Sequence, residues 1–219
     1  MRPKGGKSVD WLSVLPLTVV MVAGPQIVAA VFLVASREAK RSSLAYVAGA
    51  GLAVLIGLTV WYIVFRAIRG SGDGQNKDDG TRHLIDWIVL AVLLVLMVIV
   101  FASRKRSEPP KWMGRLEEAG PRFAFKLGFL LFIAMPSDEA TMVAVGGTLA
   151  GHDKPWWHLL PFLALTLLLL ALPLLALLAF GQRATAALPK IRDWANKHSW
   201  IISEAVILIF VAIVVSDLI

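Results

Sequence analysis

The sequence predicts an all-α integral membrane protein of six transmembrane helices, arranged as two inverted three-helix repeats with interrupted helices 1 and 4. Three observations support this prediction. Hydrophobic residues make up 58% of the 219 residues and charged residues 17%, with a mean hydropathy of +0.72, whereas soluble domains average about 25% charged residues. Several apolar stretches reach the roughly 20 residues that a helix needs to cross the hydrocarbon core. Two of these stretches carry a proline near the middle, at corresponding positions of the two halves.

The hydrophobic stretches define the expected helices. Backbone groups in lipid must be hydrogen-bonded internally, so spanning segments are helices rather than open strands. The stretches leave too few residues for a separate soluble domain. We therefore expect a single membrane domain over residues 1–219, with repeat one at about 11–103 and repeat two at about 120–219. The expected spans are 11–35, 43–65, 84–102, 123–150, 157–180 and 200–218.

The first three spans follow from their composition and their ends. Residues 11–35 are a longer apolar stretch than the roughly 7–15 residues of a signal-peptide core, so we expect a retained helix. Residues 43–65 follow a basic turn, and residues 84–102 are almost continuously apolar. Tryptophans such as Trp61 and Trp157 lie near predicted span ends, where their amphipathic rings favour the interface, so we interpret them as depth anchors.

The last three spans repeat this plan. Residues 123–150 carry the second interruption, residues 157–180 are rich in leucine, and residues 200–218 resemble residues 84–102. Each repeat would contain three spans, an odd number, so the two halves would insert with opposite orientations. That is the inverted arrangement found in many transporters.

The distribution of basic residues predicts the orientation. Of the 22 Lys and Arg residues, 13 lie in the first, third and fifth loops, against 8 in the two termini and the other loops. Cytoplasmic loops carry an excess of Lys and Arg. We therefore expect a multi-pass protein of the cytoplasmic membrane with both termini outside.

The two interruptions are the main candidate site. The first is Gly24-Pro25-Gln26, and the second begins Pro136-Ser137, 111 positions after the first proline. Proline removes a backbone donor and clashes with the preceding turn, so each helix can break near the midplane. The following half-helix then presents unpaired N–H groups and a positive dipole end, which attract an anionic group. The alternative is that both prolines only kink their helices, as membrane helices tolerate.

Ionisable residues within the spans are further candidates. Asp138 and Glu139 follow the second proline, where a charge costs roughly 2.5–3.5 kcal/mol at the bilayer centre and usually marks a substrate or ion pathway. One of them could cap the half-helix, while the other could carry a proton, since removal from water favours the neutral acid. Glu204 has an interfacial or a pathway role. Lys126, which we expect to snorkel to the cytoplasmic surface, is a candidate for contact with an anionic head group.

A family resemblance covers nearly the whole chain. The segments GPQIVAAVFLVAS, AYVAGAGLAVLIG, MPSDEA and RDWANKHSWIISEAVILIF resemble the Gap/Sap-like family of glycopeptidolipid- and sulfolipid-addressing proteins, within the LysE-type exporter superfamily. The resemblance implies six spans in two halves and export of a lipid-linked envelope component. The site residues it implies are Gly24, Pro25, Gln26, Pro136, Ser137, Asp138, Glu139, Asn196, Trp200 and Glu204.

The leading functional hypothesis is a transporter that exports or flips a lipid or lipid-linked anionic envelope component, coupled to protons. One alternative is an exporter of small solutes such as amino acids or cations. Another is a non-transporting membrane scaffold for envelope assembly. The expected partners are membrane lipids, a lipid or small-molecule substrate and protons. A second copy of the chain, in a homodimer, is a further candidate partner.

Other classes of function find no support in the sequence. The absence of cysteine excludes disulfides, thiolate metal sites and cysteine nucleophiles. The four histidines lack metal-ligand spacing, and no phosphate-binding glycine loop or nucleophile elbow is present. We therefore expect no enzyme activity, no catalytic residue, no cofactor and no metal. The net charge of +7 lies mainly in the loops between spans, so we expect no nucleic-acid binding.

Overall fold

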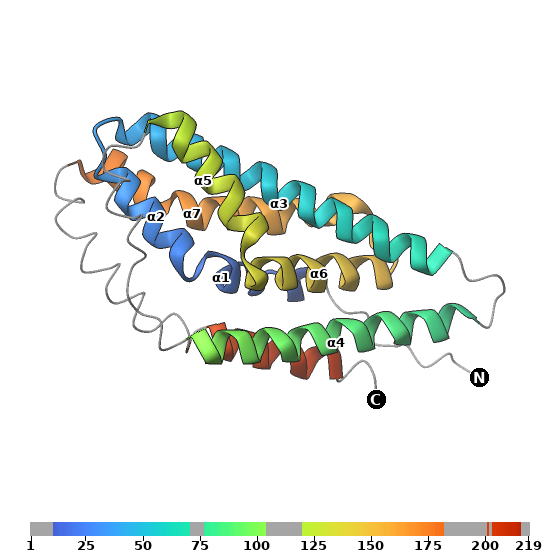
Figure 1. Cartoon of the computed structure of the whole chain (residues 1–219). Helices are drawn as coiled ribbons and strands as arrows, with labels where there is room; N and C mark the ends of the chain where they lie inside the picture. The colour runs from blue at the N-terminus through green and yellow to red at the C-terminus, as the bar shows by residue number, and fades with distance from the viewer. Residues whose placement is uncertain (1–10, 71–76, 104–119, 182–200, 202, 216–219) are drawn as a thin grey trace.

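The computed structural model describes residues 11–70, 77–103, 120–181, 201 and 203–215, and every regular element within these ranges is a helix. Figure 1 shows their arrangement. In chain order the elements are η1 (Trp11–Val14), α1 (Leu17–Val22), α2 (Pro25–Val34), α3 (Ala39–Gly70), α4 (Lys77–Ser103), α5 (Pro121–Ala134), α6 (Pro136–Gly151), η3 (Trp156–Leu159), α7 (Leu160–Phe180) and a last apolar helix, Ser203–Val215.

Helices occupy all six predicted hydrophobic stretches, but their lengths differ from the prediction. Within the described residues, three helices are long and apolar enough to cross a membrane: α3, residues His83–Ala102 of α4, and Trp156–Phe180. A fourth is added if the bent pair α5–α6 is one span. The pieces of the first stretch and the last helix are each shorter than a span. The chain is thus an all-helical membrane protein, and six spans in two inverted repeats stay a prediction.

Both predicted interruptions are present. Helix α1 ends at Val22, Ala23 is extended, and Gly24 has a φ of 120° that favours glycine, before α2 starts at Pro25. Helix α5 ends before the extended residue Met135, and α6 starts at Pro136 with a bend of 67°. The cause is local: proline disfavours a helical conformation in the residue before it, yet fits the first position of a new helix.

Helix α6 lies at the centre of the bundle, between α3 and α4 (Figure 1). Helix α5, which precedes α6, crosses the first half of α3 at two glycines. A Cβ atom on Gly49 would collide with the backbone carbonyl of Phe125, and one on Gly128 with the carbonyl of Tyr46. The two backbones are therefore in direct contact, as small residues allow between membrane helices.

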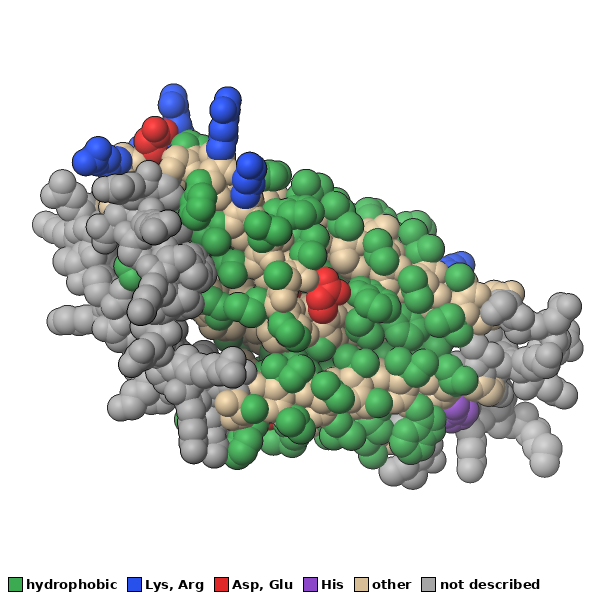
Figure 2. Space-filling view, in the orientation of Figure 1, with side chains coloured by type: hydrophobic (Ala, Val, Ile, Leu, Met, Phe, Trp, Pro, Cys, Tyr) green, Lys and Arg blue, Asp and Glu red, His purple; other side chains and the backbone are tan. Residues whose placement is uncertain are grey.

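The surface separates apolar and charged regions. Hydrophobic side chains cover most of the described face in Figure 2, and an acidic side chain lies in the middle of it. Lys and Arg side chains gather at the end where α3 and α5 begin. Large exposed apolar residues such as Leu130, Leu168 and Leu172 (57%, 52% and 49% exposed) fit a protein whose solvent is lipid.

Candidate functional site

The two interruptions meet through a buried hydrogen bond. Nε2 of Gln26, in the first turn of α2, donates to Oδ2 of Asp138, in the first turn of α6, at 2.6 Å. Gln26 is 1% exposed and Asp138 is fully buried. The prolines place both side chains at the start of a half-helix. The structure therefore brings together two helix starts that lie far apart in the sequence.

A tyrosine of α3 supports this junction. The hydroxyl of Tyr46, which is fully buried, donates to the backbone carbonyl of Gln26 at 2.9 Å. On the α6 side, the hydroxyl of Thr141 donates to the carbonyl of Ser137 at 2.8 Å. Three helices thus fix the positions of the amide and the carboxyl group.

Two buried oxygens at this junction accept no hydrogen bond from the described residues. They are Oε1 of Gln26 and Oδ1 of Asp138. Leaving such an acceptor buried without a donor costs about 1–3 kcal/mol, and more for a charged group. A proton on Asp138, or a donor group of a ligand, would remove that cost. The junction is therefore suited to exchange of protons or donor groups.

Asp138 and Glu139 point to different partners, as expected for adjacent positions on a helix. Glu139 is half-buried, and its Oε2 accepts a hydrogen bond at 3.1 Å from Nε1 of Trp61 on α3. Asp138 instead faces Gln26 within the core. The sequence left open which acid would face inward, and the structure assigns the buried position to Asp138.

The other predicted site residues lie apart from this junction or outside the described residues. Glu204 on the last helix is half-buried, and its Oε1 accepts no hydrogen bond from the described residues. Lys126 is exposed on α5. Asn196 and Trp200 lie outside the described ranges. Among the described residues, no three His, Asp or Glu side chains converge as a metal site requires.

The sequence did not identify Tyr46 and Trp61 as site residues. The sequence predicts a depth anchor at Trp61, because the expected span 43–65 ends close to it. The helix continues to Gly70, which places Trp61 more than two turns from its end. A tryptophan that packs inside the bundle needs a hydrogen-bond acceptor for its N–H group. Had the position of the helix end been known, the sequence would have suggested such an acceptor for Trp61.

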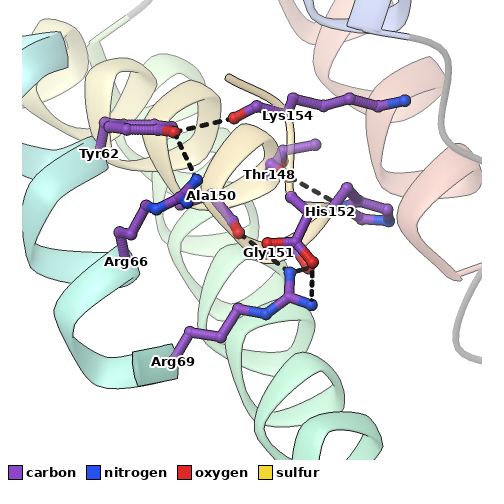
Figure 3. A network of polar contacts seen from close by, with 9 residues as sticks. Tyr62, Arg66, Arg69, Thr148, Ala150, Gly151, His152 and Lys154 are labelled. Carbon is purple, nitrogen blue, oxygen red and sulfur yellow. Dashed lines mark hydrogen bonds and ion pairs between the residues drawn. The ribbon is translucent and has the colours of Figure 1, made fainter. Parts of the chain in front are cut away.

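A second polar network holds the far end of α6 (Figure 3). Arg69 of α3 donates to the carbonyls of Ala150 and Gly151 at 3.3 and 2.6 Å and forms an ion pair with Asp153 at 2.5 Å. These are the last carbonyls of α6, whose dipole end favours a cation. Beside them, the hydroxyl of Tyr62 donates to the carbonyl of Lys154 at 2.9 Å. Helix α6 is thus fixed to α3 at its C-terminal end.

Comparison with known proteins identifies a family. Residues 14–217 match the family described as Sap, sulfolipid-1-addressing protein. No curated protein and no solved structure matches the chain. The match includes both interruptions, α3 and the last helix, and it confirms the family resemblance seen in the sequence.

Proposed function

Because the chain belongs to the Sap, sulfolipid-1-addressing protein, family, we propose that it exports or flips a lipid or lipid-linked anionic envelope component across the cytoplasmic membrane. The observation that carries this proposal is the buried hydrogen bond between Gln26 and Asp138. It joins two broken helices inside a bundle whose outer surface is apolar. Polar groups at broken helices are the usual substrate and ion sites of membrane transporters.

Asp138 would couple transport to protons. An ionised Asp138 offers only acceptor oxygens, next to Oε1 of Gln26, which accepts no hydrogen bond within the described part of the chain. A protonated Asp138 offers an O–H donor beside the amide of Gln26 and the N-termini of α2 and α6. That second state suits an anionic head group, since donors and positive dipole ends then face it. Binding of the proton and of the anion would be linked.

Alternating access would use the two breaks. We propose six spans in two inverted repeats of the LysE type, with both termini outside and one repeat rocking against the other. The bend at Met135, the extended residue Ala23 and the positive-φ residue Gly24 lie where backbone dihedrals can change without breaking a continuous helix. Such positions act as hinges in domain movements.

A reconstituted system tests this function. Full-length protein is inserted into phospholipid vesicles that carry a trace of fluorescent phosphatidylglycerol, and a membrane-impermeant quencher reports movement of the label between leaflets. We expect Asp138→Asn to abolish this movement, because the amide cannot exchange a proton, while circular dichroism and gel filtration stay unchanged. Asp153→Asn, which changes an exposed acid just beyond the C-terminal end of α6, opposite to the end that carries Asp138, serves as the matched control.

Two results would contradict the proposal. Movement of the label at the wild-type rate in Asp138→Asn vesicles would refute proton coupling at this residue. Flux of a labelled amino acid with no movement of any lipid probe would favour the small-solute alternative. Comparing envelope lipids of cells with and without the chain would identify the natural cargo.

A further inference from the structure

An open pocket of about 670 Å³ lies between the turn that joins α2 to α3 and the end of α7. Its polar side is formed by Arg37, Glu38, Lys40 and Arg41, all of them exposed. Its apolar side includes Leu177 and Leu178, in the last turn of α7. None of these residues belongs to the junction of Gln26 and Asp138.

The pocket carries a net positive charge. Three basic side chains face one carboxylate, and that carboxylate, Glu38, is 4.0 Å from Arg41. Both groups are strongly exposed, at 83% for Arg41 and 52% for Glu38, so this ion pair is weak and leaves Arg41 accessible. Lys40 and Arg41 lie in the first turn of α3, and Figure 2 shows Lys and Arg side chains at the end of the molecule where α3 begins. Within the described residues, Arg37 and Lys40 form no ion pair with a carboxylate, so two cations are available to an anionic group.

The apolar side continues as a strip along α7. Leu177 packs on a small buried cluster of Val31, Val34 and Leu174, which makes that wall rigid. Leu178 is 54% exposed. Three exposed leucines precede Leu178 at intervals of three or four positions, namely Leu175, Leu172 and Leu168. This spacing places them on the same helix face. The pocket therefore opens onto an apolar track that leads into the membrane.

We propose that this pocket binds the head group of an anionic phospholipid, whose acyl chains lie along the apolar strip of α7. Guanidinium and ammonium groups bind phosphate oxygens through charge-assisted hydrogen bonds, and basic residues at the end of an apolar helix attract anionic lipids. The occupant is a lipid rather than a soluble anion because half of the lining is apolar and continues to the lipid-facing surface. This binding site does not depend on transport.

Native mass spectrometry of the full chain tests the site. The protein is purified in a neutral detergent, and its retention of phosphatidylglycerol is compared with that of phosphatidylcholine. The triple variant R37Q/K40Q/R41Q should bind phosphatidylglycerol about tenfold or more weakly, since each basic residue near the membrane surface contributes about fivefold. Glu38→Gln should bind it more strongly, because it removes the one carboxylate among the described lining residues.

The matched control is R66Q/R122Q, which removes two exposed basic residues, one on α3 and one on α5, outside the pocket. We expect it to retain phosphatidylglycerol within about twofold of the wild type. All substituted residues are exposed, so folding should be unchanged, and circular dichroism checks this. Equal losses in both multiple variants would overturn the proposal, because binding would then follow net charge alone. Displacement of the lipid by inorganic phosphate at equal concentration would also overturn it.

Discussion

The indole N–H group of Trp61 on α3 donates to Glu139, while the neighbouring Asp138 bonds to Gln26 on α2. The two acids of the second interruption thus have separate partners on separate helices. One is buried in the core, and the other is half-buried beside α3. Substitutions of the partners can therefore distinguish their roles.

Trp61→Phe should weaken the contact between α3 and α6. The ring remains, but the donor to Glu139 is lost, so we expect a loss of about 1.5–3 kcal/mol in the free energy of unfolding, as for a hydrogen bond to a charged group. Unfolding in mixed detergent and denaturant measures it. Trp157→Phe is the control, because Trp157 is 63% exposed. If both variants lose the same free energy of unfolding, the hydrogen bond from Trp61 to Glu139 does not contribute to stability, and only the packing of the ring does.

The bond between Gln26 and Asp138 can be measured with a double-mutant cycle. Gln26→Leu leaves Asp138 buried without its donor, and we expect a cost of about 1–3 kcal/mol. The double variant Q26L/D138L should recover part of that cost, because no buried carboxyl group then lacks a partner. Residues in one hydrogen-bond network show coupling energies of about 0.5–3 kcal/mol. Additive losses would mean that the two side chains do not interact.

Gly128→Ala should disrupt the crossing of α3 and α5. The added methyl group meets the backbone carbonyl of Tyr46, which cannot move without displacing α3. We expect lower yield of folded protein in gel filtration and a lower unfolding temperature. Gly70→Ala is the control, since nothing lies within 4 Å of a Cβ there, and alanine favours helix over glycine. Wild-type stability of Gly128→Ala would contradict the close crossing.

Arg69→Gln should loosen the C-terminal end of α6. The guanidinium binds two carbonyls and Asp153, and its side chain is 12% exposed. We expect a loss of about 1.5–3 kcal/mol, the range for hydrogen bonds to charged groups. Hydrogen exchange should rise in residues 148–152. Arg66→Gln, which removes one bond to the hydroxyl of Tyr62, should cost less. Similar effects of the two variants would argue against capping by Arg69.

The absence of cysteine makes the orientation directly testable. Gly80→Cys and Gly120→Cys are a matched pair, because both glycines are exposed and nothing lies within 4 Å of a Cβ at either. An impermeant maleimide should label residue 80 in intact cells and residue 120 only after permeabilisation. The reverse pattern would place the basic loops outside. Labelling of both in intact cells would rule out the proposed crossing between them.

The sequence predicted the helical class, the hydrophobic stretches and both breaks, because apolar length and proline act locally. It did not predict that α3 continues five residues beyond the expected span to Gly70, because the apolar pattern does not define where a helix ends in water. It also could not show that Gln26 meets Asp138 or that Trp61 meets Glu139. These contacts depend on how α2, α3 and α6 cross, and hydrophobic periodicity contains no information on the crossing.

Helix α6 is enclosed by protein along most of its length, since all residues from Thr141 to Gly151 are buried. Its neighbours include α1, which precedes it, and the long helices α3 and α4. Such a helix has little surface of its own to offer to acyl chains. Because its packing surfaces are supplied by helices that come earlier in the chain, we expect substitutions that displace α3 or α4 to leave α6 without its native contacts.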